Sequence, residues 1–191
     1  AIALVVLCII AFIAFAFRGV SGEGVGSARV QSWKYGVVAI ITLLHDILIP
    51  LGLFAALGHF VGAEVDALFI VALLTILGIS INDTIVVFDR IRENLNKAKE
   101  KHVDEEFGPL VGRSLRETIV RSFNTSATTL IALAVLFFVG SVATENFALA
   151  LGMGVIAGTY SSIFLASPLL VAIEEWQRKR TEKHARGHKQ R

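Results

Sequence analysis

Asp83 is a carboxylic acid inside an apolar stretch of the chain, ISINDTIVVFDRIREN, residues 79–94. A charge at the centre of a membrane helix costs about 2.5–3.5 kcal/mol on insertion scales, so it should face protein or water rather than lipid. The stretch ends in four charged residues: Asp89, Arg90, Arg92 and Glu93. Asp83 is therefore the first candidate for a functional residue, and the four charged residues mark where the segment would leave the membrane.

Proton transfer is the chemistry that such a carboxylate could perform. Burial disfavours its charged form, whereas a nearby arginine favours it. A carboxyl group held between these influences can take up and release a proton, and intramembrane acids mark proton or ion pathways. The alternative is structural: Asp83 only hydrogen-bonds Thr or Asn neighbours and fixes helix packing. The residues alone leave both interpretations open.

Helical geometry, at about 100° per residue, indicates which way Asp83 faces. With Thr75 as reference, one arc of roughly 140° holds Asp83 together with Gly78, Asn82, Asp89 and Arg90. On the next apolar segment, a comparable arc holds Arg121, Asn124, Thr125, Thr128 and Thr129. We therefore predict that these two helices face each other across a shared polar interior, with Arg121 near its cytoplasmic mouth.

His45 and Asp46 form a second pair inside an apolar segment, about 15 Å from the start of their helix by rise per residue. Histidine can titrate near neutral pH. The pair could take part in proton transfer, or it could be an internal hydrogen-bonded pair that fixes helix packing, and both interpretations stay open. We group the pair with Asn82, Thr125, Thr128 and Thr129 as a supporting polar network.

The elements that position these residues follow from blocks of apolar sequence in a chain that is 54% hydrophobic. A membrane span needs about 20 mostly apolar residues. We predict an all-α, polytopic membrane bundle of five transmembrane helices, at about 1–17, 35–57, 66–88, 122–142 and 146–173. A basic tail, residues 174–191, follows. The chain begins with Ala inside an apolar run that has no basic leader, so we expect that something precedes it.

Lys and Arg residues set the expected orientation. Residues 18–34, 89–121 and the tail from 174 hold 3, 8 and 7 of the 18 Lys and Arg residues, and the other two loops, at 58–66 and 140–147, hold none. The positive-inside rule places the basic segments in the cytoplasm, including the C-terminus. The basic tail is interpreted as a topology signal attracted to anionic lipid, with nucleic-acid or ribosome contact as the alternative.

A stripe of small residues runs along the last apolar segment at a spacing of four: Ala150, Gly154, Gly158, Ser162 and Ala166. Small residues let helix backbones approach closely in a membrane, which predicts a packing face. The alternative is that small residues are simply common in membrane helices.

Other kinds of chemistry have no support in the sequence. We find no nucleotide-binding loop, zinc-ligand spacing or nucleophile motif, so we predict no catalytic residue, no metal and no cofactor other than protons as a coupling ion. The single cysteine, Cys8, cannot form an internal disulfide. We therefore expect that the chain is not an enzyme.

Four segments occur in the order typical of one family: TLLHDILIPLG, SINDTIVVFDRIREN, SLRETIVRSFNTSATTL and GVIAGTYSSIFLASPLL. The second closely resembles the hallmark segment of SecF, a family of protein-export membrane proteins that belongs with SecD to the resistance-nodulation-division superfamily. The resemblance covers nearly the whole chain. It implies that residues 1–173 are helices 2–6 of a six-helix fold, without the first helix and the periplasmic domain. The chain resembles either a separate SecF or the SecF half of a fused chain.

The resemblance also implies a function. SecF-like proteins act with SecD beside the SecYEG channel in the cytoplasmic membrane of bacteria or archaea, and use the proton-motive force to promote translocation of preproteins. The family's essential membrane Asp falls on Asp83, and its essential Arg falls on Arg121. Expected partners are SecD, SecYEG, the preprotein and membrane lipid, without nucleic acid. The alternatives are a proton-driven transporter of small molecules or lipids, and a purely structural scaffold.

Overall fold

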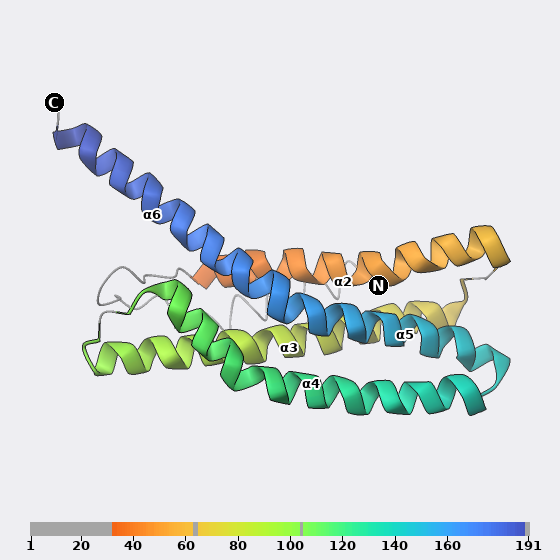
Figure 1. Ribbon diagram of the computed structural model, residues 1–191. Coiled ribbons are helices and arrows are strands. Elements are labelled where there is room, and N and C mark those ends of the chain that lie inside the picture. The colour runs from red at the N-terminus through yellow and green to blue at the C-terminus, as the bar shows by residue number, and fades with distance from the viewer. Residues whose placement is uncertain (1–31, 63–64, 104, 190–191) are drawn as a thin grey trace.

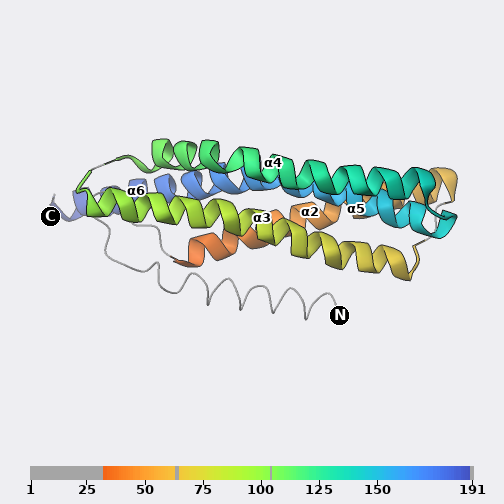
Figure 2. The same ribbon diagram turned by 90° about the horizontal axis from the view of Figure 1, so that it is seen from below.

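Long helices lie side by side in an elongated bundle (Figures 1 and 2). The computed structural model describes residues 32–62, 65–103 and 105–189. Its elements are α2 (Ser32–Val61), α3 (Ala67–Glu100), α4 (Phe107–Val139), α5 (Val142–Ser161), the short π-helix η2 (Ser162–Ala166) and α6 (Ser167–Lys189). The predicted all-α class is confirmed for the part of the chain that the structure describes.

Four stretches are long and apolar enough to cross a membrane: Lys34–Val61, Ala67–Glu100, Phe107–Val139 and Thr144–Arg180. The last of these joins α5, η2 and α6 in one continuous helical path, whose final turns leave the bundle at an angle (Figure 1). Five spans were predicted and four are found among the described residues. The predicted span over 1–17, with Cys8, lies outside them.

Two helices are longer than the predicted spans. α3 continues to Glu100 instead of ending near 88, and α4 begins at Phe107 instead of near 122. The added turns of α3 are amphipathic, because Ile91 and Leu95 are buried while charged neighbours stay at the surface. We call this end of the bundle the basic end, since residues 89–121 carry 8 Lys and Arg residues.

Local signals set both ends of α3. At its start, the Asp66 carboxylate accepts a hydrogen bond from the backbone N–H of Phe69 at 2.8 Å. This N-cap gives a partner to an N–H group that has none within the first helical turn. At its end, Lys97 and Lys99 lie in the last turn, where positive charge is favourable. His102 then adopts a φ of 52°, and this left-handed conformation ends the helix.

α5 packs closely against α3 through small residues. A Cβ added at Gly154 would lie 2.2 Å from Cγ1 of Ile76, and one added at Gly158 would lie 3.2 Å from Cβ of Ser80. The stripe predicted from the sequence is buried in the bundle: Ala150, Gly154, Gly158, Ser162 and Ala166. The absence of side chains at the two glycines therefore lets the two helices approach closely.

The apolar core has two halves. One half, towards the basic end, is built around Tyr35, Phe88 and Leu170. The other half is built around Phe54 and Leu73. Between them, all four long helices contribute buried polar side chains, and we call this level the polar layer: Thr42, Asp46, Ser80, Asp83, Thr84, Thr118, Ser122, Ser126, Ser161 and Ser162. The candidate site is sought there, because polar groups buried in a membrane protein are costly and are kept for packing or function.

Candidate functional site

Asp46 joins three helices in the polar layer. Its side chain is fully buried, and its Oδ2 atom accepts hydrogen bonds from the hydroxyl groups of Ser80 on α3 and Ser161 on α5, the latter at 2.8 Å. Its Oδ1 atom lies 3.0 Å from Nδ1 of His45. Both oxygens of the carboxylate therefore have partners, which holds α2, α3 and α5 together. His45 itself is half-buried, at the outer side of this cluster.

Asp83 is the second buried carboxylate of the layer. It is 7% exposed, on the side of α3 that is turned into the bundle. Arg121 lies on α4, which packs against α3. Arg121 is exposed on the surface of this chain. The structure thus places the two residues that the sequence singled out on adjacent helices, one buried and one exposed, with no hydrogen bond or ion pair between them.

The polar arc predicted on α4 does not face α3. Asn124, Thr125 and Thr128 are exposed, and Thr129 is only half-buried. The threonine hydroxyls donate to carbonyl oxygens of their own helix, as Thr125 does to Arg121 at 3.0 Å. Such a threonine satisfies its own hydroxyl and needs no partner helix. The prediction of a shared interior lined by these side chains is therefore wrong within the described chain.

A different face of α4 carries its buried polar groups: Ser114, Thr118, Ser122 and Ser126. Ser126 shares a hydrogen bond of 2.5 Å with Thr159 of α5. This face was not predicted from the sequence, although its spacing of four is the same signal that identified the small-residue stripe of α5. Serine suits a close helix contact, because it is small and still offers a hydroxyl group.

Asn82 and the exposed face of α4 lie at the surface of the bundle. Asn82 is exposed beside the buried Asp83, just as the exposed Arg121 precedes the buried Ser122. A polar surface at the level of membrane spans is unusual, because lipid offers it no hydrogen bonds. We call Asn82, Arg121, Asn124, Thr125 and Thr128 the exposed polar face.

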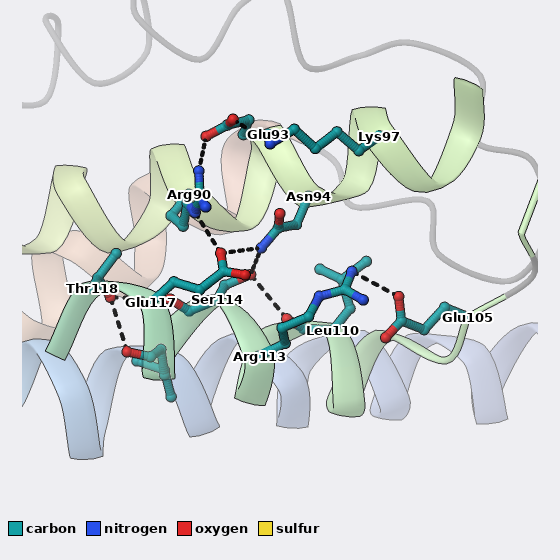
Figure 3. A network of polar contacts seen from close by, with 11 residues as sticks. Arg90, Glu93, Asn94, Lys97, Glu105, Leu110, Arg113, Ser114, Glu117 and Thr118 are labelled. Carbon is teal, nitrogen blue, oxygen red and sulfur yellow. Dashed lines mark hydrogen bonds and ion pairs between the residues drawn. The ribbon is translucent and has the colours of Figure 1, made fainter. Parts of the chain in front are cut away.

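A network of polar contacts connects α3 and α4 at the basic end (Figure 3). Arg90 donates to Glu93 on its own helix and to Glu117 on α4. Asn94 donates to Glu117 at 3.0 Å and to Ser114 at 2.9 Å. Of the four charged residues that end the apolar stretch, Arg90 and Glu93 join this network, whereas Asp89 is exposed and Arg92 is half-buried.

A polar cavity of about 250 Å³ lies beside this network. It is lined by Val86, Asp89, Arg90, Glu93, Glu117, Thr118 and Arg121. Arg121 therefore lines the cavity at the basic end together with residues of the polar network. Glu117 was not singled out from the sequence, although it lies one helical turn before Arg121.

A buried ion pair joins the beginning of α2 to α6. Lys34 and Glu174 contact each other, and the Lys34 side chain is 1% exposed. This pair was also missed, because the two residues are far apart in the sequence. Among the described residues, no group of three or more His, Cys, Asp or Glu side chains could hold a metal ion.

The fold and the site define a class of protein: a multi-pass membrane helix bundle with ionisable side chains in a buried polar layer. Residues 27–176 match the family described as "Protein export membrane protein SecD/SecF, C-terminal". The chain therefore belongs to the SecD/SecF family of protein export membrane proteins, as the sequence motifs suggested.

Relatives and a solved structure agree with this assignment. The chain is similar to the protein translocase subunit SecF of Thermobaculum terrenum, with 50% identity over 174 residues, which are 91% of this chain and 51% of that protein. It is 43% identical over 182 residues to SecF of Alicyclobacillus acidocaldarius, covering 95% of this chain and 52% of that protein. A crystal structure of SecDF in its super-membrane-facing form matches with a TM-score of 0.75 at 37% identity, over 95% of this chain and 21% of that one. The chain spans about half the length of these SecF relatives.

Proposed function

We propose that this chain is the membrane part of a SecF-type auxiliary subunit of the Sec translocase. In this role it acts with SecD beside the SecYEG channel and uses the proton-motive force to promote preprotein translocation across the cytoplasmic membrane. The family match and the SecF relatives support this proposal. The Lys and Arg asymmetry supports an orientation with the basic end and the C-terminus in the cytoplasm.

Asp83 and Arg121 are the proposed proton relay. The observation that carries the proposal is a carboxyl group only 7% exposed on a membrane helix, α3, that packs against α4, the helix that carries Arg121. Burial favours the neutral acid and the arginine favours the carboxylate, so movement of one helix relative to the other would change the proton affinity of Asp83. Such a change is what coupling proton flow to a conformational change requires.

The exposed polar face supports a partner in the membrane. Exposed amide, hydroxyl and guanidinium groups at the level of a membrane span would be poorly satisfied by lipid. We propose that SecD covers this face, so that Asn82, Asn124, Thr125 and Thr128 become part of the polar surroundings of the relay only in the assembled translocase. This would explain why a face that looks functional in the sequence points away from the helices of its own chain.

The substitution Asp83→Asn tests the relay. It keeps the shape of the side chain but removes its charge and its exchangeable acidic proton. We expect proton-dependent export to be lost, with normal insertion of the protein, and proton flux through vesicles containing the translocase to be lost as well. Glu100→Gln is the matched control, because it neutralises an exposed acid at the end of the same helix. Normal proton-dependent export by Asp83→Asn would overturn the proposal and favour a structural scaffold.

A further inference from the structure

The helical path of α5, η2 and α6 is interrupted at the short π-helix. η2 spans Ser162–Ala166, and Pro168 follows it as the second residue of α6. A π-helix bonds residues five apart and is often found at functional sites, whereas proline has no N–H group to bond to the carbonyl of Phe164, four residues earlier. Sharp bends in helices occur at such features. After this interruption α6 leaves the bundle at an angle (Figure 1).

Serine hydroxyl groups bond to backbone carbonyl groups on both sides of the π-helix. Ser161 and Ser162 each donate at 3.1 Å to a carbonyl oxygen three residues earlier. The hydroxyl of Ser167 lies 3.5 Å from the carbonyl oxygen of Ser162. Hydrogen bonds of this kind compete with the backbone ladder and often bend helices. We call residues 161–168 the hinge segment, because π-helix, proline and serines coincide there.

The start of the hinge segment is fixed to the rest of the bundle. Ser161 donates to the Asp46 carboxylate of α2 at 2.8 Å. One turn earlier, α5 approaches α3 closely, since a Cβ added at Gly158 would lie 3.2 Å from Cβ of Ser80. α5 is therefore held by two helices just before the segment, so a change of the bend would move α6 rather than α5.

Beyond the hinge segment, α6 is held against α2. Leu170 is fully buried in the half of the core built around Tyr35. One turn later, Glu174 pairs with Lys34 at the beginning of α2. The side chains of this ion pair are 10% and 1% exposed, respectively. Opposite charges buried in this way are costly to separate, so the pair fixes the distance between the two helices.

The contact of α6 with α4 is looser. A Cβ added at Gly112 of α4 would meet no atom within 4 Å. A groove of about 360 Å³ lies between the two helices, lined by Gly108, Val111, Gly112, Leu115, Ser167, Pro168, Val171, Ala172 and Glu175. Packing against α4 therefore restrains α6 less than the contact with α2 does.

We propose that the pair of Lys34 and Glu174 sets the position of α6, and that α6 pivots about the hinge segment when this pair opens. An ammonium group is costly to keep buried without its partner. Opening the pair therefore brings Lys34 to water, which requires α6 to tilt away from α2. The tilt carries the basic tail, residues 174–191, with it and is independent of the proposed proton relay.

The size of the movement follows from helix geometry. Arg178 lies about 21 Å beyond Phe164 by helical rise. A change of about 20° in the bend, the size of a sharp kink, would move Arg178 by about 7 Å. A displacement of this size is measurable as a distance between two spin labels.

Pulsed electron paramagnetic resonance measures the tilt in the full-length protein, expressed from the natural gene with its native cysteines replaced by serine and placed in lipid nanodiscs. One pair of labels joins α6 and α4, through Arg178→Cys and Arg116→Cys. A reference pair joins α3 and α4, through Glu100→Cys and Arg116→Cys. The three side chains are exposed, so the labels leave the core intact. For each pair we expect one defined distance in the parent protein.

Glu174→Gln opens the ion pair and keeps the shape of the side chain. We expect a second, defined distance between α6 and α4, shifted by about 5–10 Å, which corresponds to a bend of about 20°. The reference distance should stay unchanged. Glu175→Gln is the matched control, because it neutralises the neighbouring, exposed acid of the same helix and should keep the parent distance. Lys34→Met combined with Glu174→Met should also keep it, since apolar side chains can replace a buried ion pair.

Pro168→Ala tests the hinge segment. The new N–H group can bond to the carbonyl of Phe164 and favours an unbroken helix. Combined with Glu174→Gln, this substitution should make the displaced population smaller than in Glu174→Gln alone. An undiminished displaced population would show that α6 does not pivot at this segment.

The other outcomes also decide the proposal. A single, unchanged distance in Glu174→Gln overturns it. A broad distribution without a defined second distance does so too, because it would mean that α6 unwinds. A displaced population in Glu175→Gln or in the double methionine variant contradicts the role of the ion pair. If Glu174→Gln does not accumulate in the membrane, Lys34→Gln applies the same test, because it leaves the acid without its partner.

Discussion

Asp46 and Asp83 are buried carboxylates in the same polar layer, yet their surroundings differ. Asp46 has hydrogen-bond partners at both oxygens, from α3, α5 and its neighbour His45. The Asp83 carboxyl group makes no hydrogen bond or ion pair with another described residue, and its neighbour Asn82 belongs to the exposed polar face. A carboxylate whose partners are buried serines is held in one arrangement, whereas one without such partners is free to bind others. Burial alone therefore does not distinguish a packing residue from a relay.

Asp46→Ala gives the largest effect expected from this comparison. It leaves the buried hydroxyl of Ser80 without its acceptor and leaves Ser161 only the carbonyl oxygen of Gly158, and an unsatisfied buried group costs about 1–3 kcal/mol. We expect the free energy of unfolding to fall by about 2–4 kcal/mol, measured by unfolding in detergent micelles. Asp46→Asn keeps an acceptor oxygen and should lose less. Asp83→Ala should cost under about 1 kcal/mol, and equal losses at the two sites would remove the distinction.

Gly158→Ala tests the helix approach that keeps Ser80 beside Asp46. The new Cβ would lie 3.2 Å from Cβ of Ser80, so α5 or Ser80 must move. We expect a loss of about 1–3 kcal/mol in the free energy of unfolding, as for other overpacked contacts. Gly152→Ala is the matched control on the same helix, because its Cβ would meet Leu130 at an ordinary 3.9 Å. A loss in Gly158→Ala no larger than that in Gly152→Ala would contradict the close approach of α5 to Ser80.

Two neighbouring alanine substitutions on α4 compare a buried hydroxyl group with an exposed one, and their expected effects on the free energy of unfolding are the smallest. Ser126→Ala removes a buried hydrogen bond to Thr159, for which we expect a loss of about 0.5–1.5 kcal/mol. Thr125→Ala removes an exposed hydroxyl that bonds its own helix, and the change should stay within about 0.5 kcal/mol. In the assembled translocase, Thr125→Ala should have an effect as large as that of Ser126→Ala or larger, because the proposed partner covers Thr125. The amount of SecD that co-purifies with each variant measures this effect. If Thr125→Ala still has the smaller effect on SecD binding, the exposed polar face is not the interface.

The sequence contains enough information to predict the membrane spans and the burial of Asp83 inside the bundle. Apolar blocks of the right length predicted the four helices that the structure describes, and the cost of a charge in lipid predicted that Asp83 turns away from it. The polar arc on α4 was misplaced because Arg121 and the threonines dominate any count of polar residues. Threonine can satisfy its hydroxyl within its own helix, so a threonine-rich arc does not require a buried face. The smaller serines were the better signal.

Long-range partners could not be predicted from the sequence. Ser161 is 115 residues from Asp46 in the chain, and Ser80 is 34 residues away. Serines are present on several faces of these helices, and only the packing of α5 between its neighbours decides which of them meet a carboxylate. The start of α4 at Phe107 was not predicted either, because its first turns mix apolar and basic residues and lack the apolar signal of a span.

The buried pair of Lys34 and Glu174 has a consequence for how the protein is made. The two residues are separated by 140 positions, so the ribosome has synthesised Lys34 long before its partner exists. At about 5–20 residues per second, Lys34 waits roughly 7–28 s for Glu174. During that time the ammonium group must stay in water or at the lipid headgroups, because an unpaired charge is costly to bury. Closing this contact is thus a late event in biogenesis, and the first helix of the described bundle can settle into its final position only after the last one has emerged.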